Sequence, residues 1–309
     1  MVEGGREPDQ AVKVSVALST FNHEAYIAQA LEGALMQQTD FVYEIVVADD
    51  CSTDRTREIV REYQTRFPDR IRTLFPPENL GFAGNGIFAK LLQELRGIYV
   101  AVLDGDDYWT SSAKLQKQAD FLDAHPECAM CFHNVTILWQ DASQESEVFN
   151  PPAQSRISTL ADLLERQFIA YCSVMFRGGV LGQLPSWFYQ TTATDWVLHV
   201  LNAQRGSIGY LDDIMGVYRV HGGGVFSSLS KIRKLESHLA DYRRLDPALY
   251  RSHPEAKRRA MSRMYYELAR EYQHRGDWGR AVANGLRCIA ERPQMLPLVM
   301  RGMVGSRRR

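Results

Sequence analysis

The chain has 309 residues, of which 45% are hydrophobic and 24% charged, and its formal net charge is -1. These values are ordinary for a globular protein and exclude collagen-like, low-complexity and strongly charged disordered chains. No apolar run approaches the roughly 18 residues of a membrane-spanning helix. The polar opening MVEGGREPDQ lacks the apolar core of a secretory signal. We therefore expect a cytoplasmic protein with a disordered tail at residues 1–11.

The cysteines are odd in number and widely scattered, which suits a reducing compartment. Cys128 and Cys131 form one CxxC pair beside His125 and His133, and the chain has no second cysteine pair. The segment CAMCF has the pattern of a buried strand. The sequence favours that strand over a zinc site.

Charge is distributed unevenly along the chain. From Lys231 onward there are 19 basic and 8 acidic residues, a net +11, so the first 230 residues carry -12. The basic residues are scattered and match no nucleic-acid recognition motif, so we expect no nucleic-acid partner. They fit solvated helix faces, or peripheral contact with the anionic inner face of a membrane. The same helices could form a homodimer.

The first 112 residues alternate between strand and helix patterns. Apolar, β-branched runs predict four strands, at 12–19, 44–50, 71–75 and 98–103. Helical patterns follow the first three strands, at 24–37, 56–67 and 85–95. This alternation predicts a parallel sheet with right-handed crossovers.

The pattern becomes mixed beyond residue 112. It predicts helices at 113–124, at 158–166 and within 191–204, and strands near 128–139, 172–176 and in the run 208–227. From 229 the chain reads as helices only, and 267–293 has the helix, Gly-Asp turn and helix of one tetratricopeptide-like hairpin. We expect an α/β domain at 12–228, with halves 12–112 and 113–228, and an all-helical C-terminal extension at 229–309.

Three predicted strands end in polar or acidic residues. Ser19 to Asn22 follow the first strand, Asp49 and Asp50 the second, and Asp104 to Asp107 the fourth. Ligands of parallel α/β sheets bind at this edge. Carboxylates this close together repel one another unless a cation or hydrogen bonds offset their charge. Neither the dinucleotide fingerprint GxGxxG after the first strand nor a GxxxxGK[ST] loop is present.

Three ordered motifs carry a family resemblance. The segments VSVALSTFNHEAYIAQAL, EIVVADDCSTDRT and YVAVLDGDDYW resemble the opening, the second acidic motif and the DxD motif of family 2 glycosyltransferases. The resemblance covers roughly residues 12–225 and implies the GT-A fold, a Rossmann-like, mainly parallel sheet flanked by helices. It also implies an inverting, metal-dependent transfer from a nucleoside-diphosphate sugar, most often UDP-linked.

The resemblance assigns donor-site roles residue by residue. Asp106 corresponds to the ligand of a Mn²⁺ or Mg²⁺ ion, and Asp104 to a contact with the ribose or metal-bound water. Asp50 matches the acid that accepts a hydrogen bond from a uridine-type base. Phe21 stands where an aromatic ring lies against that base, although it could instead belong to the core. Ser19 is expected to touch the nucleotide through its backbone.

The acceptor side rests on two further positions. Asp195, in Thr194-Asp195-Trp196, stands where the family places the general base, although an Asp here could also cap a helix. His221 falls where many relatives place a histidine that joins the metal or the diphosphate, with a surface histidine as the alternative. Glycines 222–224 would let that loop close over the nucleotide and exclude water. Arg219 could help to hold phosphate.

The loop ENLGFAGNG departs from the family pattern. Gly84 occupies a place where many relatives have Arg, which puts a donor-phosphate contact in doubt. Asn85 is then expected in the nucleotide pocket or as a helix cap. Trp109 and Trp196 stand near the metal motif and the base, where they could stack on sugar faces or pack in the core.

Two alternatives stay open at this point. A nucleotidyltransferase shares the scaffold but usually has a glycine-rich basic loop near the first strand, and STFNHEAY lacks one. A non-catalytic relative would bind a partner through its helical tail. The acceptor is open between a glycan, a lipid-linked intermediate, a peptide and a small molecule, because fold does not determine it.

Overall fold

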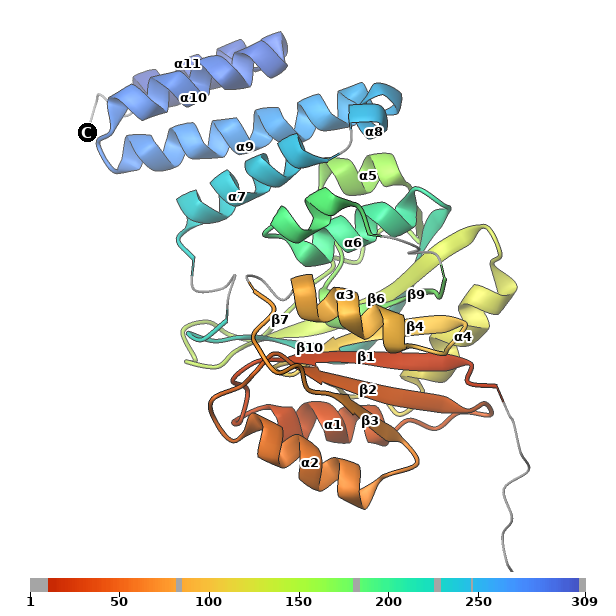
Figure 1. Ribbon diagram of the computed structural model, residues 1–309. Coiled ribbons are helices and arrows are strands. Elements are labelled where there is room, and N and C mark those ends of the chain that lie inside the picture. Colours follow the sequence, from red (N-terminus) through yellow and green to blue (C-terminus); the bar gives the residue numbers. More distant parts are fainter. Residues whose placement is uncertain (1–10, 82–84, 180–183, 225–228, 246, 306–309) are drawn as a thin grey trace, which may run out of the picture. The chain divides into compact units, whose positions relative to one another are not determined.

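The computed structural model describes the chain except for residues 1–10, 82–84, 180–183, 225–228, 246 and 306–309. Within the described residues, ten strands form one sheet (Figure 1). Two compact units share the chain: the first comprises residues 1–158, 168–184 and 201–220, and the second comprises 159–167, 185–200 and 221–309.

The first unit begins with the predicted parallel sheet. Strands β1 (Val14–Thr20), β2 (Tyr43–Asp49), β3 (Ile71–Leu74) and β4 (Tyr99–Asp104) pair in parallel in the order β3-β2-β1-β4. Helices α1 (Ile27–Leu35) and α2 (Thr56–Arg66) lie on one face and α3 (Asn85–Glu94) on the other (Figure 1). Every residue of β2 is buried, as expected for a strand covered on both faces. The strand and helix alternation read from the sequence is confirmed.

The rest of the sheet is mixed. Strand β9 (Val174–Arg177) pairs antiparallel with β4 and with β6 (Cys128–Trp139). Strand β10 (Ser207–Val220) pairs parallel with β6 and antiparallel with β5 (Tyr108–Trp109). Two short strands, β7 (Glu147–Val148) and β8 (Ile157–Ser158), pair with β6 and β10. Helix α4 (Lys114–Ala124) also belongs to this unit. Cys128 and Cys131 are buried in β6, where burial raises the pKa of both thiols, so the strand reading was right.

The second unit is helical. It holds α5 (Leu160–Glu165), a 3₁₀ turn (Ser186–Gln190) and most of α6 (Thr194–Ala203). The remaining helices are α7 (Lys231–Arg244), α8 (Pro247–Ser252), α9 (Pro254–His274), α10 (Trp278–Glu291) and α11 (Leu296–Gly305). Thus α5 and α6 group with the C-terminal helices, whereas the sequence had placed them in the α/β domain. The domain boundary at 228 and 229 stays a prediction.

The turn between α9 and α10 follows directly from its residues. Gly276 adopts a φ of 77°, which glycine adopts without strain, and the Asp277 carboxylate caps α10 by accepting from the Arg280 N–H at 3.0 Å. The described helices include none long and apolar enough to cross a membrane.

Candidate active site

The carboxyl end of β1 gathers both acidic motifs. Its Thr20 carbonyl accepts from the Asp50 N–H at 3.0 Å, and its Ser19 carbonyl accepts from the Gly105 N–H at 2.8 Å. Strand register places Thr20 beside Asp49 and Ser19 beside Asp104. The two motifs, 54 residues apart in sequence, therefore flank one strand end.

Gly105 makes this close approach feasible. A Cβ at this position would lie 2.5 Å from Thr20 Oγ1 and 2.9 Å from His23 Nδ1. Any larger residue between the acids would therefore push the motif away from β1.

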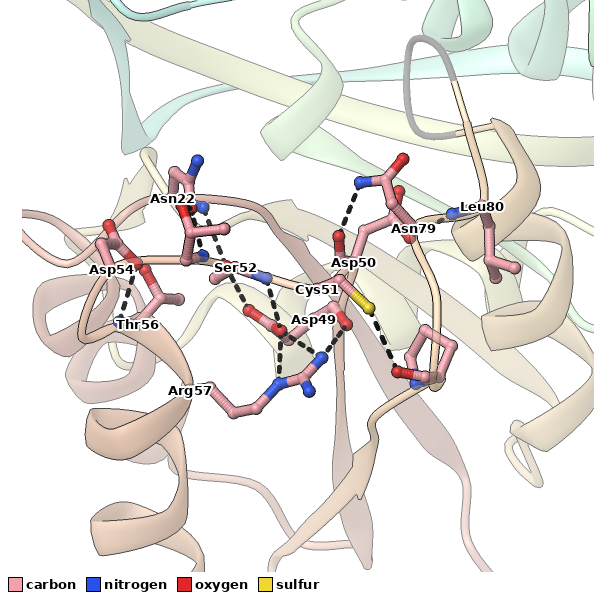
Figure 2. Close-up of polar contacts among 12 residues, drawn as sticks. Asn22, Asp49, Asp50, Cys51, Ser52, Asp54, Thr56, Arg57, Asn79 and Leu80 are labelled. Carbon is pink, nitrogen blue, oxygen red and sulfur yellow. Dashed lines mark hydrogen bonds and ion pairs between the residues drawn. The ribbon is translucent and has the colours of Figure 1, made fainter.

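Asp49 is a structural acid. Its buried carboxylate accepts from the Arg57 Nε at 2.8 Å and from the Ser52 N–H at 3.1 Å, and the Ser52 hydroxyl also donates to it (Figure 2). A buried charge with a full set of partners is stable where it lies. Asp49 thus fastens the loop after β2 to α2.

Asp50 presents its carboxylate to the loop after β3. Oδ1 accepts from the Leu80 N–H at 2.7 Å, and the Asp50 carbonyl accepts from the Asn79 side chain at 2.7 Å (Figure 2). Burial raises the pKa of Asp50, and the Leu80 hydrogen bond partly opposes that shift. The Leu80 hydrogen bond to Oδ1 therefore fixes the orientation of the Asp50 carboxylate.

Phe21 does not belong to the core. Its side chain is 42% exposed, which settles the alternative that the sequence left open. The loop that carries it is held by Asn22, whose backbone has a φ of 55°. The Asn22 side-chain oxygen accepts from the Thr53 N–H at 2.8 Å, and the Asn22 backbone N–H donates to the Ser52 hydroxyl at 2.9 Å (Figure 2). An exposed ring on a fixed loop suits contact with a ligand.

The three acids of the DGDD motif have different environments. The Ser19 hydroxyl donates to Asp104 Oδ1 at 2.6 Å. Asp107 is buried and accepts from the Arg219 N–H at 2.8 Å, and burial together with the nearby Asp106 charge raises its pKa. The Asp106 side chain is 19% exposed. The Ser19 side chain thus holds Asp104, and the expected backbone contact of Ser19 with the nucleotide stays a prediction.

Arg219 braces this motif. It is buried, and its Nε donates to the Asp106 carbonyl at 2.7 Å. Two more guanidinium N–H groups donate to the side chains of Gln140 and Gln29. The guanidinium also lies over the rings of Tyr26 and Tyr108, at 4.6 and 5.2 Å. These contacts use three of the five guanidinium N–H donors. The suggested phosphate role of Arg219 stays a prediction.

A set of potential metal ligands includes Asp106. His23 Nε2 lies 3.7 Å from Asp106 Oδ2. His221 follows Val220, the last residue of β10, by one peptide bond. Among the described residues, His23, Asp106 and His221 are the group of three that could hold a metal ion. One carboxylate and two imidazoles suit Mn²⁺ better than Mg²⁺, which prefers oxygen ligands. The donor set thus fits the metal that the family implies.

Both tryptophans are core residues. Trp109 is 2% exposed, and its Nε1 donates to the Cys172 carbonyl at 2.8 Å. Trp196 is 1% exposed, donates to the Leu163 carbonyl at 3.2 Å, and stacks on Tyr242 with ring centroids 4.4 Å apart. The idea that they stack on sugar faces was therefore wrong.

Asp195 lies in the first turn of α6, in the second unit, and is partly exposed. Removal of its carboxyl from solvent raises the pKa of Asp195, the Trp196 N–H bond and the charge of His238 lower it, and the charge of Asp241 has a smaller raising effect. Asp241, on α7, is itself buried and accepts from the Thr192 hydroxyl at 2.8 Å and from the Ala193 N–H at 2.9 Å. A carboxylate of α7 thus fixes the chain directly before Asp195.

The sequence analysis made predictions for two residues of the loop before α3. Asn85 is the first residue of α3 and is buried, and its place in a nucleotide pocket stays a prediction. Gly84 lies outside the described residues. Sequence reasoning also missed His23 and Asp241. The position of His23, three residues beyond a strand that ends at the ligand edge, could have revealed it, but no local signal marks Asp241.

Residues 15–182 match the family model described as glycosyl transferase family 2. The chain belongs to this family. An uncharacterized protein of Mycobacterium tuberculosis is 39% identical over 216 residues, which cover 70% of this chain but only 61% of that protein. The putative teichuronic acid biosynthesis glycosyltransferase TuaG of Bacillus subtilis is 30% identical over 224 residues, which cover 72% of this chain and 84% of TuaG. The chain thus spans less than two thirds of its mycobacterial relative.

Solved structures agree with the fold. Residues 1–349 of Staphylococcus aureus TarS give a TM-score of 0.64 at 18% identity, covering 94% of this chain and 87% of that chain. The same TarS fragment in complex with UDP-GlcNAc gives 0.59 at 19% identity, covering 91% and 92%. The mannosyltransferase PcManGT of Pyrobaculum calidifontis, in complex with GDP-Man and Mn²⁺, gives 0.58 at 18% identity, covering 93% and 78%. The expected GT-A fold is confirmed.

Proposed function

We propose that this chain transfers a sugar from a nucleoside-diphosphate sugar, with a uridine-type donor, to an acceptor hydroxyl with inversion at the anomeric carbon. The observation that carries the proposal is the placement of Asp50 and the DGDD motif on either side of β1, in a chain of this family. The nucleotide sugars bound by TarS and PcManGT support a donor of this class.

The donor would bind along the end of β1. Asp50 has one carboxylate oxygen oriented by Leu80, and the other would accept the imide N–H of a uracil ring, with Phe21 against the base. Asp104, held by Ser19, would accept from the ribose. Asp106, His23 and His221 would hold Mn²⁺. Bound there, the ion would stabilise the charge on the departing diphosphate.

Asp195 would act as the general base. In a single in-line displacement, the acceptor oxygen forms the new glycosidic bond as the bond to the diphosphate breaks, and the hydroxyl proton passes to the Asp195 carboxylate. The raised pKa of Asp195 makes its carboxylate a better proton acceptor than an ordinary aspartate. Transfer should fail below that pKa, because the protonated acid cannot accept a proton.

Thermal shift with a panel of nucleotides tests the proposal. UDP and UDP-sugars should raise the melting temperature only with Mn²⁺, and Asp106→Ala should lose this shift. Asp195→Asn should keep donor affinity within about threefold but abolish release of the nucleoside diphosphate. Asp141→Asn, in an exposed turn, is the matched control and should change neither. A metal-independent shift, or turnover in Asp195→Asn, would contradict these assignments.

The released product separates the alternatives. Glycosyl transfer releases a nucleoside diphosphate, whereas nucleotidyl transfer releases pyrophosphate. A non-catalytic relative would bind the donor and release neither. Detection of pyrophosphate in place of UDP would favour the nucleotidyltransferase reading.

A further inference from the structure

The second unit contains a cavity of about 730 Å³ between α7, α9 and α10. Each helix presents one face to it, with lining residues about three, four or seven positions apart. Examples are Glu236, Leu239 and Arg243 on α7, and Tyr265, Leu268 and Tyr272 on α9. This size is within the range of small-molecule sites, which are commonly 300–1,000 Å³.

The cavity is strongly basic. Its lining includes five arginines and one carboxylate, Glu236, for a formal charge of +4. The arginines are Arg233, Arg243, Arg275, Arg280 and Arg287. The Glu236 carboxylate already accepts from the Tyr272 hydroxyl at 2.8 Å. Like charges gathered around a cavity repel one another, so an anion bound there would be attracted by all of them.

Aromatic groups position these guanidinium groups. Arg243 donates to the Tyr265 hydroxyl at 2.7 Å, and the Arg287 guanidinium lies 6.0 Å from the same ring. The Arg280 guanidinium lies 5.4 Å from the Tyr272 ring. Stacking on a ring orients a guanidinium and leaves N–H donors for a ligand.

The arginines of the cavity differ in their acidic partners. Arg233 and Arg280 each have a carboxylate nearby, at 3.9 and 3.5 Å. Within the described part of the chain, no carboxylate lies within 4.0 Å of Arg243, Arg275 or Arg287. Outside the cavity, Lys231, Arg258 and Arg259 all pair with glutamates. Three guanidinium groups without a carboxylate partner therefore line one cavity that has room for a ligand.

We propose that this cavity binds a phosphate-bearing ligand, held by Arg243 and Arg287 in a site separate from the sugar-nucleotide site. Arginine forks match phosphate oxygens in bidentate geometry. The phosphate group comes either from a soluble phosphate ester or from a lipid headgroup, and the experiment distinguishes these sources.

Calorimetric titration of the full chain with inorganic pyrophosphate, in EDTA and at constant ionic strength, tests the soluble source. Pyrophosphate should bind saturably, and Arg243→Gln with Arg287→Gln should weaken binding at least tenfold, because each charge-assisted hydrogen bond is worth about a factor of ten. The matched control is Arg258→Gln with Arg270→Gln, which removes the same charge from α9 outside the cavity. The pyrophosphate affinity of this control should stay within about twofold of the wild-type affinity.

Sedimentation with phosphatidylglycerol vesicles, against phosphatidylcholine vesicles, tests the lipid source. Binding to either probe that is lost only in the cavity variant supports the proposal and identifies the source. Binding to neither probe, or equal losses in both double variants, overturns it. Arg287→Gln alone, at an exposed position, replaces the double variant if the latter melts early.

The donor site provides an independent readout. The Mn²⁺-dependent UDP shift should be unchanged in the cavity variant, so failure of one site leaves the other testable. A cavity variant that loses UDP binding and pyrophosphate binding together would overturn the separation of the two sites.

Discussion

Lys114 is a buried lysine that packs against Trp109, shortly after the acidic motif in the sequence. It lies in the first turn of α4, is 0% exposed, and its Nζ lies 3.7 Å from the centroid of the Trp109 ring. Among the described residues, no hydrogen-bond acceptor contacts this amine. Burial lowers the pKa of Lys114 from 10.5 to about 7, so folding disfavours the charged form despite the ring beneath it.

The direction of the pH effect follows from this depressed pKa. Above pH 10.5 the amine is neutral in both states, and no charge penalty exists. Between pH 10.5 and pH 7 the unfolded chain holds a proton that the folded chain lacks, so stability falls as the pH falls. Each pH unit below 10.5 lowers the unfolding free energy by about 1.4 kcal/mol. Burial of Lys114 therefore costs about 4 kcal/mol at pH 7 and about 2 kcal/mol at pH 9.

Urea denaturation of the wild type and Lys114→Met, at pH 7 and pH 9, measures this penalty. The advantage of the methionine variant should shrink by about 2 kcal/mol between the two pH values, since methionine carries no proton. Groups that titrate in both proteins cancel in this comparison. Lys90→Met, at an exposed position on α3, should show no such change. An advantage that stays constant from pH 7 to pH 9 would refute the argument.

Three further substitutions test the site. Arg219→Met should cost about 2–4 kcal/mol of unfolding free energy and lower kcat, because the Asp106 carbonyl loses its guanidinium donor; unchanged kcat would show that the brace is dispensable. Asp241→Asn should lower kcat at unchanged donor affinity and move the acid limb of the pH–rate profile to lower pH, since a negative charge near Asp195 is lost; an unmoved profile would count against it. Trp109→Phe should cost about 1 kcal/mol in denaturation and leave donor KM unchanged, and a large rise in KM would restore the sugar-stacking role.

The parallel half of the fold was predictable because its signals are local. Runs such as EIVVADD are apolar and β-branched over a whole strand, and each is followed by a helical pattern. The observed strand Tyr43–Asp49 differs from the predicted 44–50 by one residue at each end. The convergence of Asp50 and Asp104 could also be predicted, because parallel strands end at the same edge.

The mixed half depends on pairing between distant segments. Strands β5, β7 and β8 have two residues each, too few for a periodic pattern, and exist because a longer strand offers them an edge. The burial of some polar side chains could not be predicted from the sequence either. Lys114 stands in a polar helical segment, and only the packing against Trp109 shows that it is enclosed.

The DGDD motif shows how one short segment can accommodate three like charges. Asp107 is buried and tied to the Arg219 backbone, and its raised pKa favours the neutral form there. Asp104 is held by the Ser19 hydroxyl. Asp106 is partly exposed, like Asp104, and has a histidine nearby. Because position in the turn, more than residue type, determines these environments, exchanging aspartate for asparagine at each position should separate folding, donor binding and metal binding into three different defects.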